Sequence, residues 1–309
     1  MTGGFRMISL DRKQVDRTPL VACIGYFDGL HKGHQALIHA TIEEAKKRGC
    51  ASGLITFSPD PWVTLKGIRP NEEEHLTTMQ QRIALAHEYG IDKVFVLDFS
   101  KKVAALSPDD FLSRILGQLN LQCLVCGYDF HFGAFGKGDG AYLKANAPFA
   151  IIEVGEVSED GVKISSTRIT ELVKAGEMEK AEQLMGRPFE TAGTVVHGLA
   201  NGHKLGFPTA NLSCPVEYVR PRGGVYAGYF IHNGEKYKAM INFGHNPTVA
   251  WQSHMSLEAN ILDFEGDLYG QKASLQFKKY LRPEKTFDSI DDLIAQLKKD
   301  QETVRELLA

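Results

Sequence analysis

Two kinds of hydrophobic pattern follow one another along the 309 residues, and the change between them near Gly186 limits the possible fold more than any other feature. Before Gly186, short apolar runs alternate with stretches of helical periodicity, which is typical of a parallel, doubly wound α/β sheet. The expected strands are 20–24, 53–57, 94–97, 121–126 and 150–154, and the expected helices are 35–47, 79–89, 108–119 and 167–185. We therefore expect a doubly wound α/β domain over residues 1–186.

After Gly186-Arg187-Pro188 the period of β-strands dominates, and the expected strands are 193–197, 225–232, 236–242, 257–263 and 273–280. Asn233-Gly234 lies between two of them and is a strong signal for a two-residue hairpin turn. Residues 289–308 return to helical spacing. The sequence therefore predicts an antiparallel β-barrel with a C-terminal helix docked on it, over residues 187–309.

The bulk composition narrows the kinds of partner. A formal net charge of -3 gives no broad electrostatic attraction to nucleic acid or to an anionic membrane surface. The sequence has neither the roughly 18 apolar residues of a membrane helix nor the apolar segment of a secretory signal. Its five scattered cysteines do not indicate a disulfide framework and fit a reducing cytoplasm. Small molecules are the expected partners, and the oligomeric state stays open.

Cys123 and Cys126 form a C-x-x-C inside an apolar run. On a strand, these two side chains would point to opposite faces of the sheet. The sequence also lacks a second C-x-x-C or a nearby histidine pair that would complete the spacing of a zinc site. We therefore expect both cysteines to be buried core residues rather than a redox pair or metal ligands.

Residues 25–34, GYFDGLHKGH, follow the first expected strand and open the first helix. Proteins with α/β sheets bind nucleotides at the carboxyl ends of their strands, and a helix N-terminus offers free N–H groups to phosphate. The three glycines allow a ligand close to the backbone, and His31 and His34 can face the same phosphates. A surface or metal-binding histidine pair is the common alternative. The strand-turn-helix context favours a phosphate site suited to nucleotidyl transfer.

Residues 25–34 resemble the signature GxFDGxHxGH of the HxGH nucleotidyltransferases. Three later segments, in family order, resemble the bacterial bifunctional riboflavin kinase/FAD synthetase family: GYDFHFG at 127–133, ISSTR at 164–168 and LGFPTAN at 205–211. Together the matches span nearly the whole chain. The resemblance implies that ATP phosphorylates riboflavin to FMN and then adenylylates FMN to FAD, with Mg²⁺ as the cofactor.

In the first module, the resemblance implies catalytic roles for His31, His34 and Arg168, which bind and polarise the phosphates of ATP. An arginine suits this role because its guanidinium clamps phosphate. The residues implied to line the nucleotide and flavin site are Gly25, Phe27, Asp28, Gly33, Asp129, Phe130, Ser166 and Thr167. A plain helix N-cap is the structural alternative for the serine and threonine.

In the second module, Thr209 and Asn211 are the candidate magnesium ligands, because their side-chain oxygens lie two residues apart and suit a hard cation. A turn stabilised by these two side chains is the structural alternative. Glu258 interrupts an apolar strand, where an outward-facing carboxylate is ordinary. Its segment resembles the family's VExHILDF, which implies that Glu258 deprotonates the ribityl 5′-hydroxyl. The other residues implied to bind flavin or nucleotide are Lys204, Gly206, Pro208, Asn246 and Arg282.

Several residues depart from the family's pattern. Asp60 stands where a histidine is usual, and Gly136 where an arginine is expected. In the second module, Asn201 and His203 replace two arginines, and Asn260 replaces a histidine. Each lost charged hydrogen bond to phosphate is worth about 1.5–3 kcal/mol. Two alternatives therefore stand beside the bifunctional enzyme: an FMN adenylyltransferase with a degenerate flavin-binding barrel, and a non-enzymatic flavin sensor.

Overall fold

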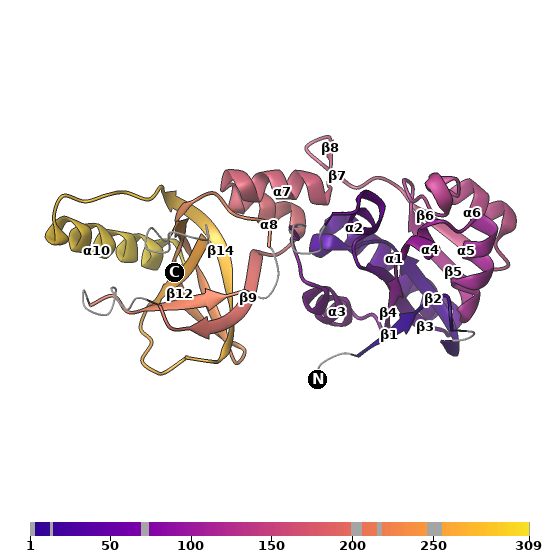
Figure 1. The fold of residues 1–309 in the computed structure, drawn as a ribbon, viewed down its shortest axis with the longest axis horizontal. Coiled ribbons are helices and arrows are strands. Elements are labelled where there is room, and N and C mark those ends of the chain that lie inside the picture. The colour runs from indigo at the N-terminus through magenta and orange to yellow at the C-terminus, as the bar shows by residue number, and fades with distance from the viewer. Residues whose placement is uncertain are drawn as a thin grey trace. The chain divides into compact units, whose positions relative to one another are not determined.

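The computed structural model describes residues 4–12, 15–68, 74–198, 206–214, 218–245 and 255–308. The chain divides into two compact units, Met1–Ser165 and Ser166–Ala309 (Figure 1). Within the described residues, no helix is both long and apolar enough to cross a membrane. The expected module boundary near residue 186 lies inside the second compact unit, and the assignment of residues 1–186 to one functional module stays a prediction.

In the first unit, the described residues form one six-stranded sheet of order β1-β4-β3-β2-β5-β6, in which every neighbouring pair is parallel. This confirms the doubly wound α/β fold. The strands of this sheet are β1 (Phe5–Ile8), β2 (Asp16–Ile24), β3 (Ala51–Ser58), β4 (Lys93–Asp98), β5 (Leu119–Gly127) and β6 (Ala150–Val154). A separate antiparallel pair follows, β7 (Ser158–Glu159) and β8 (Val162–Lys163), and it was not expected. The edge strand β1 was not expected, because its four residues are too few to show a period.

The helices of this unit begin and end at recognisable signals. For example, Thr78 caps the helix α3 by accepting a hydrogen bond from Gln81 N, and Gly49 ends α1 in the left-handed conformation at φ 64°. The α-helices are α1 (Lys32–Arg48), α2 (Pro61–Lys66), α3 (Met79–Glu88), α4 (Lys101–Ala104), α5 (Pro108–Arg114) and α6 (Gly140–Asn146), and the 3₁₀ turns are η1 (Asp28–Leu30), η3 (Leu116–Gln118) and η4 (Ala134–Gly136).

The helix expected over 108–119 is shorter in the structure. The helix α5 ends at Arg114, residues 116–118 form the 3₁₀ turn η3, and Leu119 already begins β5. The side chain of Gln118 donates to the carbonyl oxygens of Ser9 and Arg114, which fixes this tight turn between the helix and the strand. Apolar periodicity could not show the change, because leucines continue on both sides of it.

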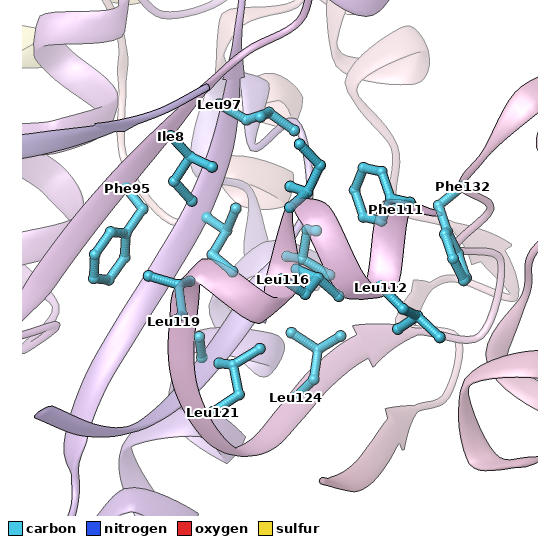
Figure 2. Packing of buried hydrophobic residues seen from close by; sticks show 14 of the residues in the cluster. Ile8, Phe95, Leu97, Phe111, Leu112, Leu116, Leu119, Leu121, Leu124 and Phe132 are labelled. Carbon is cyan, nitrogen blue, oxygen red and sulfur yellow. The ribbon is translucent and has the colours of Figure 1, made fainter. Parts of the chain in front are cut away.

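The core of the first unit lies on both faces of the sheet. Successive side chains of β5 alternate between two clusters, with Leu124 and Cys126 in one and Cys123 and Val125 in the other. Figure 2 shows the first cluster, in which Leu116 packs near Leu124. The two cysteines are therefore buried on opposite faces, as expected. Burial raises the pKa of Cys126 to about 11, which disfavours its reactive thiolate form.

In the second unit, six strands close into an antiparallel barrel of order β10-β13-β12-β11-β14-β9, with β10 also paired to β9. The expected barrel is confirmed. The strands are β9 (Phe189–Val196), β10 (Thr209–Ser213), β11 (Gly224–His232), β12 (Glu235–His245), β13 (Met255–Ile261) and β14 (Lys272–Arg282), and the helices are α7 (Ser166–Ala175), α8 (Met178–Met185) and α10 (Ile290–Leu307).

Glycine decides two local features of this unit. Asn233 and Gly234 both have positive φ, 50° and 82°, and join paired strands, which confirms the expected hairpin turn. The single helix expected over 167–185 is wrong, because the chain turns at Gly176 with φ 80° and forms α7 and α8 instead. An alanine there would meet the side chains of Arg222 and Tyr280.

The C-terminal helix α10 docks on the barrel, as expected. Val304 is fully buried in an apolar cluster with residues of β11 and β12. Beside this cluster, Asp300 of α10 accepts hydrogen bonds from Nε and Nη2 of Arg282 at 2.9 and 2.7 Å. Both side chains of this ion pair are largely buried, so α10 is fixed to β14 by a charged contact as well as by apolar packing.

Candidate active sites

The glycine-rich segment forms a tight turn between β2 and α1. Phe27 and Leu30 have left-handed backbones, with φ 59° and 38°, and Gly29 between them has φ 78°. Such conformations are costly for residues with side chains and persist only where the surroundings hold them. Gly25 N donates to the carbonyl of Ile55 on β3, which ties the start of the turn to the sheet. The expected strand-turn-helix context is confirmed.

The turn brings His31 and His34 together at the first residues of α1. Their rings stack at 3.7 Å between centroids with 16° between planes, and Phe27 packs edge-on against His34 at 5.2 Å. Nδ1 of His31 accepts the hydrogen bond of His34 N, so the neutral His31 ring carries its proton on Nε2. Gly33 allows this arrangement, because a Cβ there would lie 3.1 Å from the ring of His31.

Asp28 is buried and bonded to its own protein. Its carboxylate accepts hydrogen bonds from the backbone N–H groups of Leu76 and Thr77, both at 3.0 Å, and from Arg82 Nη2 at 2.9 Å. Arg82 is only 2% exposed, so this is a fully buried ion pair. These contacts fasten the histidine turn to α3. The role implied for Asp28 in the nucleotide site stays a prediction, and Arg82 is a residue of this region that was not expected from the sequence.

Arg82 also contacts Tyr26. Its guanidinium lies 4.1 Å from the centre of the tyrosine ring and donates to the backbone oxygen and the hydroxyl of Tyr26 at 3.3 and 3.2 Å. The same hydroxyl lies 3.2 Å from Nδ1 of His75. Burial and the Arg82 charge lower the pKa of His75, so its ring is neutral near pH 7. Arg82 therefore supplies the positive charge at the centre of this group.

Asp60 also belongs to this buried region and has a structural use. Its side chain caps α2 by accepting a hydrogen bond from Trp62 N at 2.6 Å, and it lies near Tyr26. A carboxylate is a good N-cap residue, because it satisfies an N–H group that has no partner inside the helix. The departure from the family's histidine thus places a helix cap at this position.

Replacing Arg82 by methionine is expected to lower the free energy of unfolding of the first unit by about 3–5 kcal/mol, because the buried Asp28 carboxylate would lose its counter-ion. Urea unfolding followed by circular dichroism measures this loss. The matched control is Arg48→Met, which removes an exposed arginine paired with Glu44 at 2.6 Å, and it should cost far less. Equal losses in both variants would contradict the central position given to Arg82.

Other candidate residues of the first module lie at the end of β5 and beyond. The exposed carboxylate of Asp129 pairs with Lys163 of β8 (Val162–Lys163), and Phe130 stacks with Phe132 at 5.8 Å between centroids. A Cβ at Gly33 would lie 3.8 Å from the carbonyl oxygen of Ile164, so this segment passes beside the histidine turn.

The three residues of the ISST segment that were expected to hold phosphate, Ser166, Thr167 and Arg168, form the first turn of α7, as expected for residues that open a helix. They belong to the second compact unit. Their contact with phosphate, and the roles of Asp129 and Phe130 toward flavin, stay predictions.

On the barrel, the register places the candidate kinase residues on neighbouring strands. Asn211 of β10 lies opposite Glu258 of β13, and Asn242 of β12 lies opposite Glu258 on its other side. Directly opposed residues share one face of a sheet. Thr209 Oγ1 donates to Glu258 Oε2 at 3.3 Å. The result is a row of hydroxyl, amide and carboxylate oxygens, and this donor set suits magnesium.

The remaining candidates of the second module are Gly206, Pro208 and Arg282, which the structure describes, and Lys204 and Asn246, which it does not. Gly206 has φ 81°, which favours glycine, and the carbonyl of Pro208 accepts a hydrogen bond from Asn260. Arg282 directs its guanidinium to Asp300 and to the carbonyl of Pro283, so its contact with flavin or nucleotide stays a prediction. Lys204 and Asn246, like the departures Asn201 and His203, lie outside the described residues.

Two family models match successive parts of the chain. Residues 13–168 match the family model FAD synthetase, and residues 185–308 match the model riboflavin kinase. Two relatives, both described as bifunctional riboflavin kinase/FMN adenylyltransferase, come from Listeria monocytogenes and Escherichia coli K12. The first is 36% identical, covering 94% of this chain and 92% of its own length, and the second is 36% identical, covering 95% and 94%.

A solved structure is similar over the full length. The crystal structure described as a macrolide-efflux protein from Streptococcus pneumoniae has a TM-score of 0.89 and 32% identity, and the match covers 97% of this chain and 98% of that one. The relative from Bacillus subtilis, again described as bifunctional riboflavin kinase/FMN adenylyltransferase, is 34% identical over 92% of both chains. From both family models and these relatives, the chain belongs to the bifunctional riboflavin kinase/FMN adenylyltransferase family.

Proposed function

We propose that this chain phosphorylates riboflavin to FMN on the barrel and then adenylylates FMN to FAD at the histidine turn. One observation carries the proposal: a single chain holds stacked imidazoles at a helix start and, on a separate unit, a threonine hydroxyl bonded to a glutamate. Two ATP-dependent transfers need two such charge-neutralising sites. Relatives that carry both activities in their names cover more than nine tenths of the chain.

At the histidine turn, a phosphate oxygen of FMN attacks the α-phosphate of ATP, and pyrophosphate leaves. Negative charge grows on the phosphate oxygens in the transition state, so prearranged donors accelerate the step. His31 Nε2–H is such a donor, and the N-terminus of α1 adds a partial positive charge. His34 lies against the same ring and extends the donor surface.

On the barrel, Glu258 accepts the proton of the ribityl 5′-hydroxyl, and the resulting oxygen attacks the γ-phosphate of ATP. The bond between the γ-phosphorus and the bridging oxygen breaks, and ADP leaves as FMN forms. A carboxylate held within hydrogen-bond reach of its neighbours suits this general-base role. Thr209 and Asn211 are the residues that would hold magnesium. When bound, magnesium neutralises the phosphate charge and makes the γ-phosphate a better electrophile. The half-buried setting of Glu258 limits competing water around the carboxylate.

The proposal assigns residues 1–186 to adenylyl transfer and residues 187–309 to phosphorylation. Arg168, Ser166 and Thr167 are proposed to hold phosphate at the first site, where Gly25, Phe27, Gly33, Asp129 and Phe130 admit the ligands. Lys204, Gly206, Pro208, Asn246 and Arg282 are proposed to contact flavin or nucleotide at the second. The cytoplasmic location expected from the scattered cysteines, and the absence of nucleic acid and membrane partners, remain part of this proposal, and the oligomeric state stays open.

The whole chain incubated with riboflavin, ATP and Mg²⁺ should produce FMN first and FAD later, as resolved by timed chromatography. Chelation of Mg²⁺ with EDTA should stop phosphorylation. If FAD forms from FMN while riboflavin stays unchanged, with oxidised and with reduced flavin, the adenylyltransferase-only alternative is correct. Tight flavin binding with no consumption of ATP would instead identify a flavin sensor.

A further inference from the structure

A chain of two partly buried hydrogen bonds connects α10 to the residue that precedes Thr209. Gln301 Nε2 of α10 donates to Asn260 Oδ1 of β13 at 2.8 Å, and Asn260 Nδ2 donates to the carbonyl oxygen of Pro208 at 2.8 Å. Asn260 is only 3% exposed. Its amide therefore links α10 to the segment before β10. Asn260 is 41 positions from Gln301 and 52 positions from Pro208 in the sequence.

The two partners fix the orientation of the Asn260 amide. A carbonyl oxygen only accepts hydrogen bonds, so the NH₂ group must face Pro208, and the amide oxygen is then left to accept from Gln301. Loss of either partner leaves a buried polar group with fewer hydrogen bonds, which is costly. The amide therefore has one favourable position, and that position depends on α10.

The Pro208 carbonyl is a sensitive point for the kinase site. Proline has no N–H group, so the carbonyl is its only hydrogen-bonding group on the main chain. The next residue, Thr209, lies opposite Asn260 in the β10–β13 register and donates to Glu258 at 3.3 Å. A displacement of Pro208 would carry the Thr209 hydroxyl away from the Glu258 carboxylate.

The helix α10 is itself firmly held, so it can act as the fixed end of this connection. Arg282 bonds Asp300 twice, which ties α10 to β14. Gln296 Nε2 donates to the second oxygen of Asp300 at 2.8 Å, a hydrogen bond inside α10 that does not tie the helix to the barrel. Gln296 and Gln301 are thus two glutamines of one helix with hydrogen bonds of equal length. Gln296 bonds within the helix, and Gln301 bonds the barrel next to the candidate catalytic residues.

We propose that Gln301 and Asn260 are positioning residues for riboflavin phosphorylation, through which α10 sets the Thr209 hydroxyl against Glu258. This inference rests on the proposed kinase activity of the barrel. Neither residue touches a reacting atom: Asn260 acts through Pro208, and Gln301 acts through Asn260. The C-terminal helix therefore contributes to the phosphate-transfer geometry, in addition to covering an apolar face of the barrel.

The first test compares Gln301→Ala with Gln296→Ala in the full chain. Gln301→Ala should lower kcat for riboflavin phosphorylation by about threefold to tenfold, the effect of one hydrogen bond. It should also raise the Mg²⁺ concentration that gives half-maximal rate, because Thr209 is a proposed ligand. Gln296→Ala should change neither value. The rate of FAD formation from FMN, measured on the same samples, should stay constant and reports equal amounts of active first module.

The second test is a double-mutant cycle with Asn260→Ala. If Gln301 acts only through Asn260, then Gln301→Ala should have no further effect on kcat once Asn260 is alanine. Additive losses, or equal losses in Gln301→Ala and Gln296→Ala, would overturn the inference while leaving the kinase activity established by the wild type. Failure of the wild type to form FMN would overturn the proposed kinase function and this inference with it.

Discussion

FAD formation from FMN is expected to fall about a thousandfold or more when His31 and His34 are both replaced by alanine, while riboflavin phosphorylation keeps its rate. One prearranged donor to a developing oxyanion is worth about 100- to 1000-fold, and this variant removes two imidazoles that stack at 3.7 Å. The kinase rate should be unaffected because Glu258 and Thr209 belong to the other compact unit. Chromatography of reactions started from FMN and from riboflavin measures both rates.

The capping role of His31 requires a separate control. Its Nδ1 accepts the hydrogen bond of His34 N at the start of α1, so alanine would remove a helix cap as well as an imidazole. Asparagine is a good N-cap residue, and His31→Asn should therefore keep the helix and still lose adenylylation. His39→Ala, on the exposed side of the same helix, should keep both activities. Parallel loss of FMN and FAD formation in the double variant would refute separate sites.

The sequence could predict the histidine turn because its signals are local. Gly29 stands where the backbone has positive φ, and Gly33 stands where a side chain would meet the ring of His31. The strand before and the helix after them show their own periods. Such features depend on residues within about ten positions of each other, so the sequence alone is enough to predict them.

The support of that turn could not be predicted in the same way. Arg82 meets Asp28 from 54 positions away, and only the packing of α3 against the turn brings them together. One signal was available: Arg82 stands beside the buried Ile83 and one turn before the buried Ala86, where a charge needs a partner. The identity of that partner required the three-dimensional structure.

Two of the strands that were not expected, β1 and β10, have a similar explanation. β1 has four residues and β10 has five, and β10 begins inside the segment 205–211, for which a turn was the structural alternative, so neither strand shows a clear period by itself. Both are defined by their neighbours: β1 by pairing with β4, and β10 by pairing with β13 and β9. The pairing of β10 matters for function, because it places Thr209 and Asn211 on the strand next to Glu258.

Glu258→Gln is expected to lower riboflavin phosphorylation by about 100- to 10,000-fold, the usual contribution of a general base. Glutamine keeps the size of the side chain and can still accept the hydrogen bond of Thr209, which lies at 3.3 Å in the wild type. It cannot take the proton of the ribityl hydroxyl near neutral pH. The loss should therefore appear in kcat for phosphorylation, measured from the rate of FMN formation.

The same variant should convert FMN to FAD at the wild-type rate, which is the reverse of the selectivity expected for the histidine variants. Glu235→Gln is the matched control, because Glu235 is an exposed carboxylate of the same barrel at the hairpin end of β12, and it should keep both activities. If Glu258→Gln phosphorylates riboflavin normally, the carboxylate is not the base. The Thr209–Glu258 contact would then serve the barrel's structure, and the base would have to be sought among other residues.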